Sequence, residues 1–203
     1  MTAAHCLPFF PPCHAWSYIE ERTYRSLLAP LGEQPAIAAE CLFCDPIGDI
    51  AVLGSPDRQQ PELYEDSNKY DALVDAVTPF KFSAGPSRLD AMLEAHGRAR
   101  LLSLDGRWFE CRVRCFRHGP WSVMGAEPIR GGMSGSPIVA WNGPAIGVVC
   151  CGSLGEGGKD LNSGDANARL SRNLPGWLLC QWQPSGKAAL PAARASYHLK
   201  ISA

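Results

Sequence analysis

The chain lacks both long hydrophobic runs and an excess of charge of one sign, and each absence excludes a class of partner. Only 19% of its 203 residues are charged, and 19 Lys and Arg nearly balance 20 Asp and Glu for a net charge of −1. A chain so close to neutral has no strong electrostatic attraction for nucleic acid or for an anionic membrane. No apolar run approaches the roughly 20 residues needed to span a bilayer. We therefore expect no nucleic acid and no membrane among its partners.

Glycine, proline and short apolar runs are plentiful. The chain contains 20 Gly and 17 Pro, and 46% of its residues are hydrophobic. Apolar runs that are broken this often by turn-forming residues favour β-strands over helices. The length suffices for one or two small domains with buried cores. The composition thus predicts a compact all-β protein.

The nine cysteines are an odd number, so they cannot all pair within one chain. We interpret them as mostly buried, reduced thiols, which favours a cytoplasmic location. A zinc site is the alternative, built from three short motifs: Cys41-x-x-Cys44 with Cys111-x-x-x-Cys115 or with Cys13-His14. Because the first pair lies in strand-like sequence and not in a turn-rich knuckle, we expect no metal.

The segment Gly131-Gly132-Met133-Ser134-Gly135-Ser136-Pro137 places a serine among small residues. A serine hydroxyl becomes a nucleophile when a base takes its proton and donors stabilise the oxyanion that follows. Small neighbours permit a sharp turn, so two backbone N–H groups can converge there. The apolar run 137–140 that follows is typical of a buried strand. We predict Ser134 as a nucleophile, with Ser136 or a plain loop serine as the alternatives.

A base and a carboxylate lie upstream of this serine. His5 lies in the small-residue segment Thr2–Cys6, and Asp49 opens the apolar run Asp49–Leu53. An imidazole can take the serine proton, and a carboxylate can fix its tautomer and stabilise the imidazolium. Asp45 competes with Asp49 but precedes a proline at a turn, where aspartate is common. The simpler alternatives are a frayed N-terminal histidine and an aspartate that only caps a strand.

In the order His, Asp, Ser, these three segments resemble the catalytic blocks of the chymotrypsin/trypsin-like serine proteases, and most closely those of the bacterial trypsin-like peptidases. The resemblance covers residues 1 to about 182. It implies His5 as general base and acid, Asp49 as its orienter and Ser134 as nucleophile. It also implies an oxyanion hole formed by the backbone N–H groups of Gly132 and Ser134, a peptide or protein substrate, and no cofactor or metal.

The resemblance also implies a substrate pocket, with Pro128 and Ile129 at its base and Cys150, Cys151 and Gly152 in the strand that pairs with substrate backbone. Pro128 stands where an acidic residue would select Lys or Arg. We therefore expect a small or apolar residue before the scissile bond. The acidic side chain of the neighbouring Glu127 is the main argument against this expectation.

Two features depart from the family pattern. Met133 stands where digestive relatives carry an aspartate that pairs with a freed N-terminus, so we expect no activation of that kind.

Only four residues precede His5, where the family has several strands, and Cys6 lacks its family partner. Missing strands would expose sheet edges and leave His5 on a fraying terminus. We favour a start codon assigned too late over a decayed gene or a chain completed by a partner, and a secretion signal could lie in the missing segment.

The expected fold has two six-stranded Greek-key β-barrels, the first incomplete, and a C-terminal helix. We expect a partial first barrel in residues 1–66, a linker with a short helix in 67–97, a second barrel in 98–183 and a tail in 184–203. The local expectations are a helical turn within 18–31, strands at 36–43 and 50–53, a helix capped by Ser67, hairpins at Asp105-Gly106 and Asn142-Gly143, and a closing helix within 166–182. The function expected is a serine endopeptidase that acts through an acyl-enzyme, and the alternative is an inactive module that binds peptide or protein.

Overall fold

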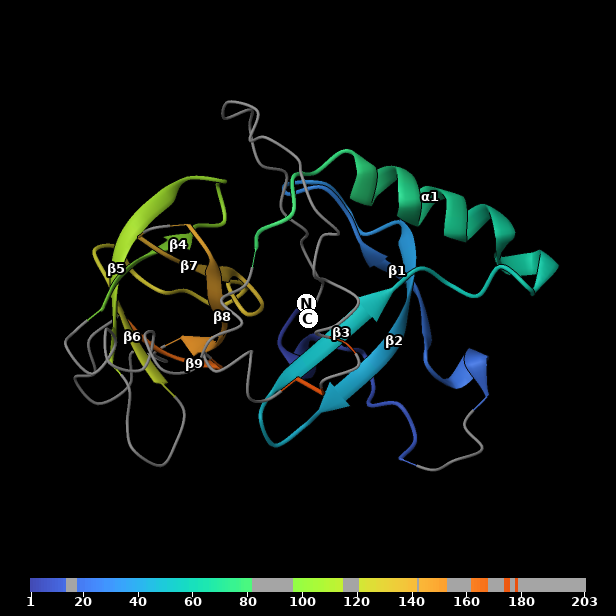
Figure 1. The fold of residues 1–203 in the computed structure, drawn as a ribbon, viewed down its shortest axis with the longest axis horizontal. Helices are drawn as coiled ribbons and strands as arrows, with labels where there is room; N and C mark the ends of the chain where they lie inside the picture. The colour runs from blue at the N-terminus through green and yellow to red at the C-terminus, as the bar shows by residue number, and fades with distance from the viewer. Residues whose placement is uncertain are drawn as a thin grey trace.

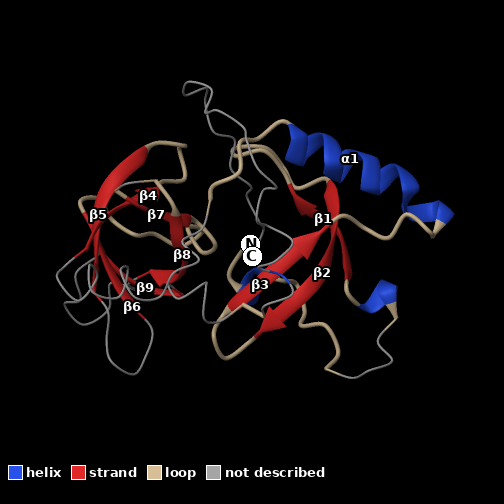
Figure 2. Ribbon diagram, in the orientation of Figure 1, coloured by secondary structure: helices blue, strands red, loops and turns tan. Residues whose placement is uncertain are grey.

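The computed structural model contains two β-structures that lie side by side (Figure 1). One is an open sheet of three strands with a helix beside it, and the other is a closed barrel of six strands (Figure 2). The structure describes residues 1–13, 18–81, 97–114, 121–141, 143–152, 162–167, 174, 175 and 178. The mostly β composition that the sequence predicts is confirmed.

The open sheet is antiparallel, in the order β1 (Thr23–Leu28), β2 (Ile37–Asp45) and β3 (Ile50–Gly54). The turn between β2 and β3 is held by Asp45, whose Oδ1 accepts the backbone N–H groups of Ile47 and Gly48 at 3.0 Å each. Such an Asx turn is a common role of aspartate before proline. The two strands and the turn predicted here are confirmed.

The short helical turn predicted within 18–31 is present, but most of that range forms a strand. Ile19–Glu21 forms a short 3-10 turn, but β1 follows it directly. The buried residues of β1 are Tyr24, Leu27 and Leu28, and the register shifts between Tyr24 and Leu28, where Ser26 has a φ of 53°. This irregularity breaks the two-residue period of a strand and leaves apolar residues at i, i+3 and i+4, which is the spacing of a helix.

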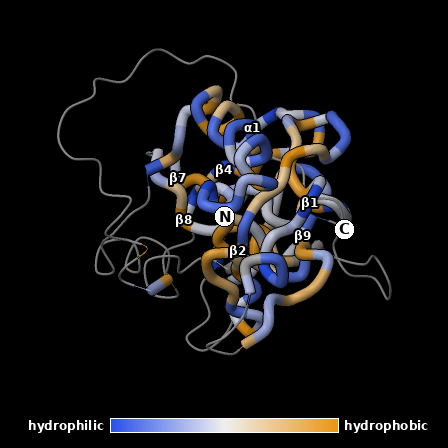
Figure 3. The backbone as a smooth tube through the Cα atoms, turned by 90° about the vertical axis from the view of Figure 1, so that its right-hand side faces the viewer, coloured by the Kyte–Doolittle hydropathy of each residue, from blue (hydrophilic) through white to orange (hydrophobic). Residues whose placement is uncertain are grey.

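The helix α1 (Tyr64–Asp75) follows a 3-10 turn at Pro61–Leu63 and is largely hydrophilic (Figure 3). Ser67 was predicted to cap its N-terminus, but this prediction is wrong because the helix begins three residues earlier. Ser67 is fully buried, and its Oγ lies 2.7 Å from Ser55 Oγ and accepts the Arg58 Nε–H at 2.7 Å. The hydroxyl therefore anchors the helix to the segment after β3. The rest of the predicted linker, 82–96, lies outside the described residues.

The N-terminal segment is tied to the open sheet. Thr2 and Ala51 exchange two backbone hydrogen bonds, of 3.0 and 2.9 Å, and Ala3 and Ala4 are fully buried. A short 3-10 turn, η1, then covers Ala4–Cys6. The expectation that His5 lies on a fraying terminus is therefore wrong, because the residues before it extend the sheet at β3.

The barrel closes in the order β4-β5-β6-β9-β8-β7, with every neighbouring pair antiparallel. Its strands are β4 (Gly97–Leu102), β5 (Trp108–Arg114), β6 (Trp121–Gly125), β7 (Pro137–Ala140), β8 (Ala145–Gly152) and β9 (Ser163–Asn167). Burial alternates along β5, so one face of the strand fills the barrel core and the other faces outward. The closed barrel predicted for this part of the chain and the hairpin at Asp105-Gly106 are confirmed, and β7 pairs with β8 as predicted, although residue 142 of their turn lies outside the described residues.

Two expectations about the barrels are corrected. The first β-structure, expected to be an incomplete six-stranded barrel, is an open sheet of three strands in the described residues. The closing helix cannot begin at residue 166, because β9 continues to Asn167. Within the remainder of that range the structure describes residues 174, 175 and 178, of which Leu178 is helical and packs on Ile50 and Val52. The predicted tail lies outside the described residues. Within the described part of the chain no helix is long and apolar enough to cross a membrane.

Candidate active site

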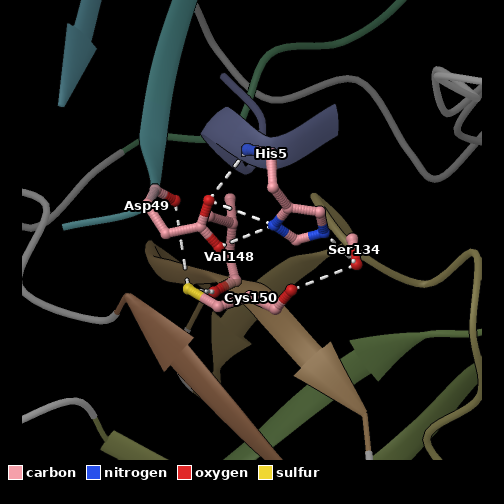
Figure 4. A network of polar contacts seen from close by, with 5 residues as sticks. All are labelled: His5, Asp49, Ser134, Val148 and Cys150. Carbon is pink, nitrogen blue, oxygen red and sulfur yellow. Dashed lines mark hydrogen bonds and ion pairs between the residues drawn. The ribbon is translucent and has the colours of Figure 1, made fainter. Parts of the chain in front are cut away.

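His5, Asp49 and Ser134 meet between the sheet and the barrel and form one chain of polar contacts (Figure 4). The ring Nδ1 of His5 lies 2.9 Å from Asp49 Oδ2 and 3.1 Å from Oδ1. The opposite ring nitrogen, Nε2, lies 2.9 Å from Ser134 Oγ. When Nδ1 carries the proton and donates it to the carboxylate, Nε2 is left as an acceptor for the serine hydroxyl. The three residues singled out in the sequence are thus arranged as base, orienter and nucleophile require.

Asp49 is held by its own backbone as well as by its neighbours. It is the residue before β3 and has a φ of 50°, a left-handed conformation that aspartate adopts more readily than most residues. Its Oδ1 accepts the backbone N–H of His5 at 2.9 Å. One carboxylate therefore positions both the main chain and the ring of His5.

Ser134 lies in a loop that two glycines allow to fold back. Gly132 has a φ of 87° and Gly135 a φ of 80°. A Cβ on Gly135 would lie 2.4 Å from Thr2 Oγ1 and 3.4 Å from the Ala3 nitrogen. The missing side chain thus lets the serine loop approach the segment that carries His5. The sequence marked Gly135 as part of the serine motif, but it gave no sign of this contact with Thr2.

The backbone amides of the serine loop fall into two groups. Met133, Gly135 and Ser136 donate to the carbonyl groups of Arg130, Val149 and Met133, at 2.8 to 3.1 Å. Within the described part of the chain, the amides of Gly132 and Ser134 donate to no backbone carbonyl. Backbone N–H groups that have no carbonyl partner remain available as donors to an anion.

The serine hydroxyl has a second contact. Ser134 Oγ donates to the carbonyl oxygen of Cys150 on β8, at 3.1 Å. Since a hydroxyl has one proton, this carbonyl and His5 Nε2 compete for it. The contact also fixes the position of Oγ between β8 and the imidazole. Sequence reasoning did not find it, because it depends on a backbone oxygen.

Two thiols lie beside the three residues. Burial raises the pKa of the Cys6 thiol, and the nearby Asp49 carboxylate adds to the rise. The Cys150 thiol donates to the backbone oxygen of Asp49 at 3.9 Å and is 9% exposed. A buried thiol whose pKa is raised is a poor nucleophile, so Ser134 is a stronger candidate than Cys6.

The residues expected around a substrate pocket have different surroundings. Ile129 is 1% exposed and belongs to the barrel core, so its side chain does not line an open pocket. Pro128 is partly exposed. Glu127, the acidic neighbour, has Oε2 at 3.6 Å from Arg107 Nη2. For Gly152 and for Cys151 the structure describes backbone, which pairs with Gly164 and Asp165 of β9.

Met133 packs in the barrel core at 2% exposure, and its sulfur accepts the Arg130 N–H at 3.3 Å. This thioether fixes the start of the serine loop from inside the barrel. The role of Met133 is therefore to pack and position the loop, and its side chain has no charge with which to form an ion pair.

The form of the zinc alternative that joins Cys41 and Cys44 to Cys111 is not brought together in the described residues. Cys41 packs in the core of the open sheet, whereas Cys111 packs in the core of the barrel. Burial raises the pKa of each thiol to about 12. The described part of the chain contains no group of three or more metal-ligating side chains, and the six cysteines whose side chains it describes are free. His14 and Cys115 lie outside the described residues.

Comparison with known proteins identifies no relative: no family, no curated protein and no solved structure matches the chain. The fold and the site therefore define it as a mostly β protein with a closed six-stranded barrel and a His–Asp–Ser constellation. Any statement of function rests on the chemistry of this constellation.

Proposed function

We propose that the protein is a serine endopeptidase that hydrolyses peptide bonds through an acyl-enzyme intermediate. The continuous chain of contacts from Asp49 through His5 to Ser134 supports this proposal most directly. Each link is 2.9 Å long, which is within reach for proton transfer to and from a positioned imidazole.

In the first half of the reaction, Ser134 Oγ attacks the carbonyl carbon of the scissile bond while His5 Nε2 takes its proton. The carbonyl oxygen becomes an oxyanion, which the N–H groups of Gly132 and Ser134 stabilise. Asp49 stabilises the imidazolium without taking the proton. The carbon–nitrogen bond then breaks, and His5 returns the proton to the departing amine.

In the second half, water attacks the ester carbonyl of the acyl-enzyme. His5 takes a proton from this water, and the same two N–H groups stabilise the second oxyanion. The ester bond breaks, Ser134 Oγ regains a proton from His5, and the carboxylic acid product leaves. No cofactor enters either half.

The fold we propose is that of the trypsin-like proteases, with the closed barrel as the second barrel and the open sheet as part of the first. Substrate backbone would add alongside the end of β8, where Cys150 lies next to Ser134. We propose a small or apolar residue before the scissile bond, and the distance of 3.6 Å between Glu127 and Arg107 supports it, because that acid already faces a guanidinium.

A module that binds peptide without hydrolysing it is the second candidate. The open three-stranded sheet and the Cys150 carbonyl that competes for the Ser134 proton are the observations that favour it. Both features would weaken the activation of the nucleophile and leave the binding of an extended peptide intact.

A fluorophosphonate probe, which labels activated serines, separates the two candidates. The endopeptidase proposal predicts labelling of the unmodified protein and of Ser136→Ala, the neighbouring serine, and loss of labelling in Ser134→Ala and His5→Ala. Circular dichroism verifies that all variants are folded. A folded, unmodified protein that takes no label supports the binding module, and a Ser134→Ala variant that still takes label contradicts the nucleophile.

A further inference from the structure

The outer face of the barrel carries four arginines on two neighbouring strands. Arg98 and Arg100 lie on β4, and Arg112 and Arg114 lie on β5, at alternate positions of each strand. All four are exposed, whereas the intervening residues face the barrel core. We call these four residues the arginine face. It is unexpected on a chain whose net charge is −1.

The register brings like charges together. Arg98 lies directly opposite Arg112, and like charges in such a cross-strand pair are destabilising. Only one acidic residue, Glu110, alternates with these arginines on the two described strands, and its carboxylate accepts Arg98 Nε at 2.8 Å and Nη2 at 3.1 Å. Without counting Arg114, the three exposed arginines Arg98, Arg100 and Arg112 outnumber the one carboxylate of Glu110, and an anionic partner would relieve this excess of positive charge.

Two exposed apolar side chains border the arginine face. Trp141 is 47% exposed, and the guanidinium carbons of Arg98 and Arg100 lie 4.2 and 4.5 Å from its ring centroid. Met124 is 51% exposed and pairs in register with Arg112. Arginine, tryptophan and methionine are the residues enriched at the centres of protein–protein interfaces.

We propose that the arginine face, together with Trp141 and Met124, is a docking surface for an acidic segment of another polypeptide. Guanidinium groups bind carboxylates through two parallel hydrogen bonds, and the two exposed apolar side chains offer contact area to an apolar residue of the same segment. Successive same-side residues of an extended peptide are about 6.6–6.8 Å apart, which matches two arginines that alternate on one strand.

A polypeptide fits this surface better than a nucleic acid does. The carboxylate of Glu110 lies within the face and would repel a continuous phosphate backbone, whereas a peptide can place a neutral residue opposite it. The near-neutral charge of the whole chain also gives no long-range attraction for nucleic acid.

The docking surface is separate from the candidate active site. Trp141 follows β7 at the end away from Ser134, roughly 17 Å along the strand from residue 136 at about 3.3 Å per residue. In Figure 1, β5 lies at the edge of the molecule that faces away from β1 and β2. Binding here leaves Ser134 open and does not depend on hydrolysis.

Fluorescence anisotropy tests the proposal on the full chain. The probe is a labelled peptide with Glu at alternate positions and one Phe, the reference peptide carries Gln in place of each Glu, and the Ser134→Ala variant excludes cleavage. We expect the acidic peptide to bind at least about tenfold more tightly than its Gln analogue, and less tightly as salt screens the charges.

The Arg100→Gln/Arg112→Gln double variant should weaken binding at least about tenfold, and Trp141→Ala should weaken it about threefold or more. Arg25→Gln is the matched control, because Arg25 is an exposed arginine on β1 of the open sheet, and it should change nothing. Thermal melting verifies that each variant is folded.

Equal affinities for the two peptides, or an unchanged affinity in the double variant, would overturn the proposal. So would tighter binding of a short oligothymidylate than of the acidic peptide, which would assign the surface to nucleic acid. Because the readout is binding to a Ser134→Ala protein, it is independent of fluorophosphonate labelling, so failure of the docking surface and failure of the endopeptidase proposal are distinguishable.

Discussion

Asp49 holds His5 twice, through the imidazole Nδ1 at 2.9 Å and through the backbone N–H at 2.9 Å. The two contacts use different oxygens of the carboxylate. The ring can rotate only by giving up the first contact, and the 3-10 turn that carries His5 can shift only by giving up the second. The orientation of the base is therefore set by one side chain at the start of β3.

The first prediction concerns this carboxylate. Asn at position 49 keeps an acceptor for the His5 backbone, but it cannot stabilise an imidazolium and favours the wrong tautomer. We expect Asp49→Asn to lower kcat by on the order of 10³ to 10⁴ while the fold is retained. Asp45→Asn is the control, since Asn at the turn still accepts the Ile47 and Gly48 amides, and its kcat should be unchanged. Equal losses in the two variants would show that Asp49 acts through folding alone.

The second prediction concerns the contact between the serine loop and the N-terminal segment. Gly135→Ala would place a Cβ 2.4 Å from Thr2 Oγ1 at a φ of 80°, so we expect a loss of about 2–4 kcal/mol in the free energy of unfolding and a fall in kcat. Gly143→Ala has a φ of 113° with open space around the new Cβ, so it measures backbone strain alone.

Denaturant unfolding of both variants separates strain from steric overlap. Adding Thr2→Ala to Gly135→Ala removes the overlapping oxygen and should restore part of the lost stability, whereas adding it to Gly143→Ala should restore none. A Gly135→Ala protein no less stable than Gly143→Ala would mean that the two segments do not approach as closely as described.

The third prediction concerns the residue before the scissile bond. Because Glu127 faces Arg107 and Pro128 provides no charge, a peptide library should show cleavage after small or apolar residues. Arg107→Ala frees the Glu127 carboxylate, and a modest gain in cleavage after Lys or Arg should follow. Strong cleavage after basic residues by the unmodified protein would contradict this account of the pocket.

The fourth prediction concerns stability at high pH. Burial raises the pKa of Cys41 and of Cys111 from 9.0 to about 12 in the folded protein. Between these values the unfolded chain releases thiol protons that the folded protein keeps, so the free energy of unfolding should fall as the pH rises from about 9 to about 12. The stability that the two protonated thiols contribute is fully present below the unfolded pKa of 9.0.

The slope of stability against pH, from denaturant unfolding, measures this effect. Cys111→Ala should reduce the slope in that range, whatever it does to stability at neutral pH. An unaltered slope in Cys111→Ala would contradict the burial of that thiol.

Elements of the fold could be predicted from the sequence where local residues determine them, and could not be where a tertiary contact or an irregular strand determines them. The hairpin at Asp105-Gly106 was predictable because the turn needs a left-handed residue, and Gly106 has a φ of 81°. The strand β1 was not, because its irregularity around Ser26 spaces the apolar residues as a helix does. The hydroxyl of Ser67 looked like a helix cap, but a tertiary contact with Arg58 uses it.

In the candidate site, too, some residues could be predicted from local sequence and some contacts could not. His5, Asp49 and Ser134 could be singled out because each lies in a short, distinctive segment. The Thr2–Gly135 approach and the competing Cys150 carbonyl depend on how the sheet meets the barrel, and no local pattern encodes that.

The central claim is that Ser134 Oγ forms a covalent acyl intermediate. It is tested by mixing the protein with an activated ester of an apolar amino acid, quenching in acid, and locating the acyl group by peptide mapping and mass spectrometry, with Ser134→Ala as the control. We expect one acyl group per chain on Ser134, formed in a burst that Ser134→Ala abolishes. A folded protein that shows no burst, or whose acyl group lies on Cys6 or Ser136, would contradict the account.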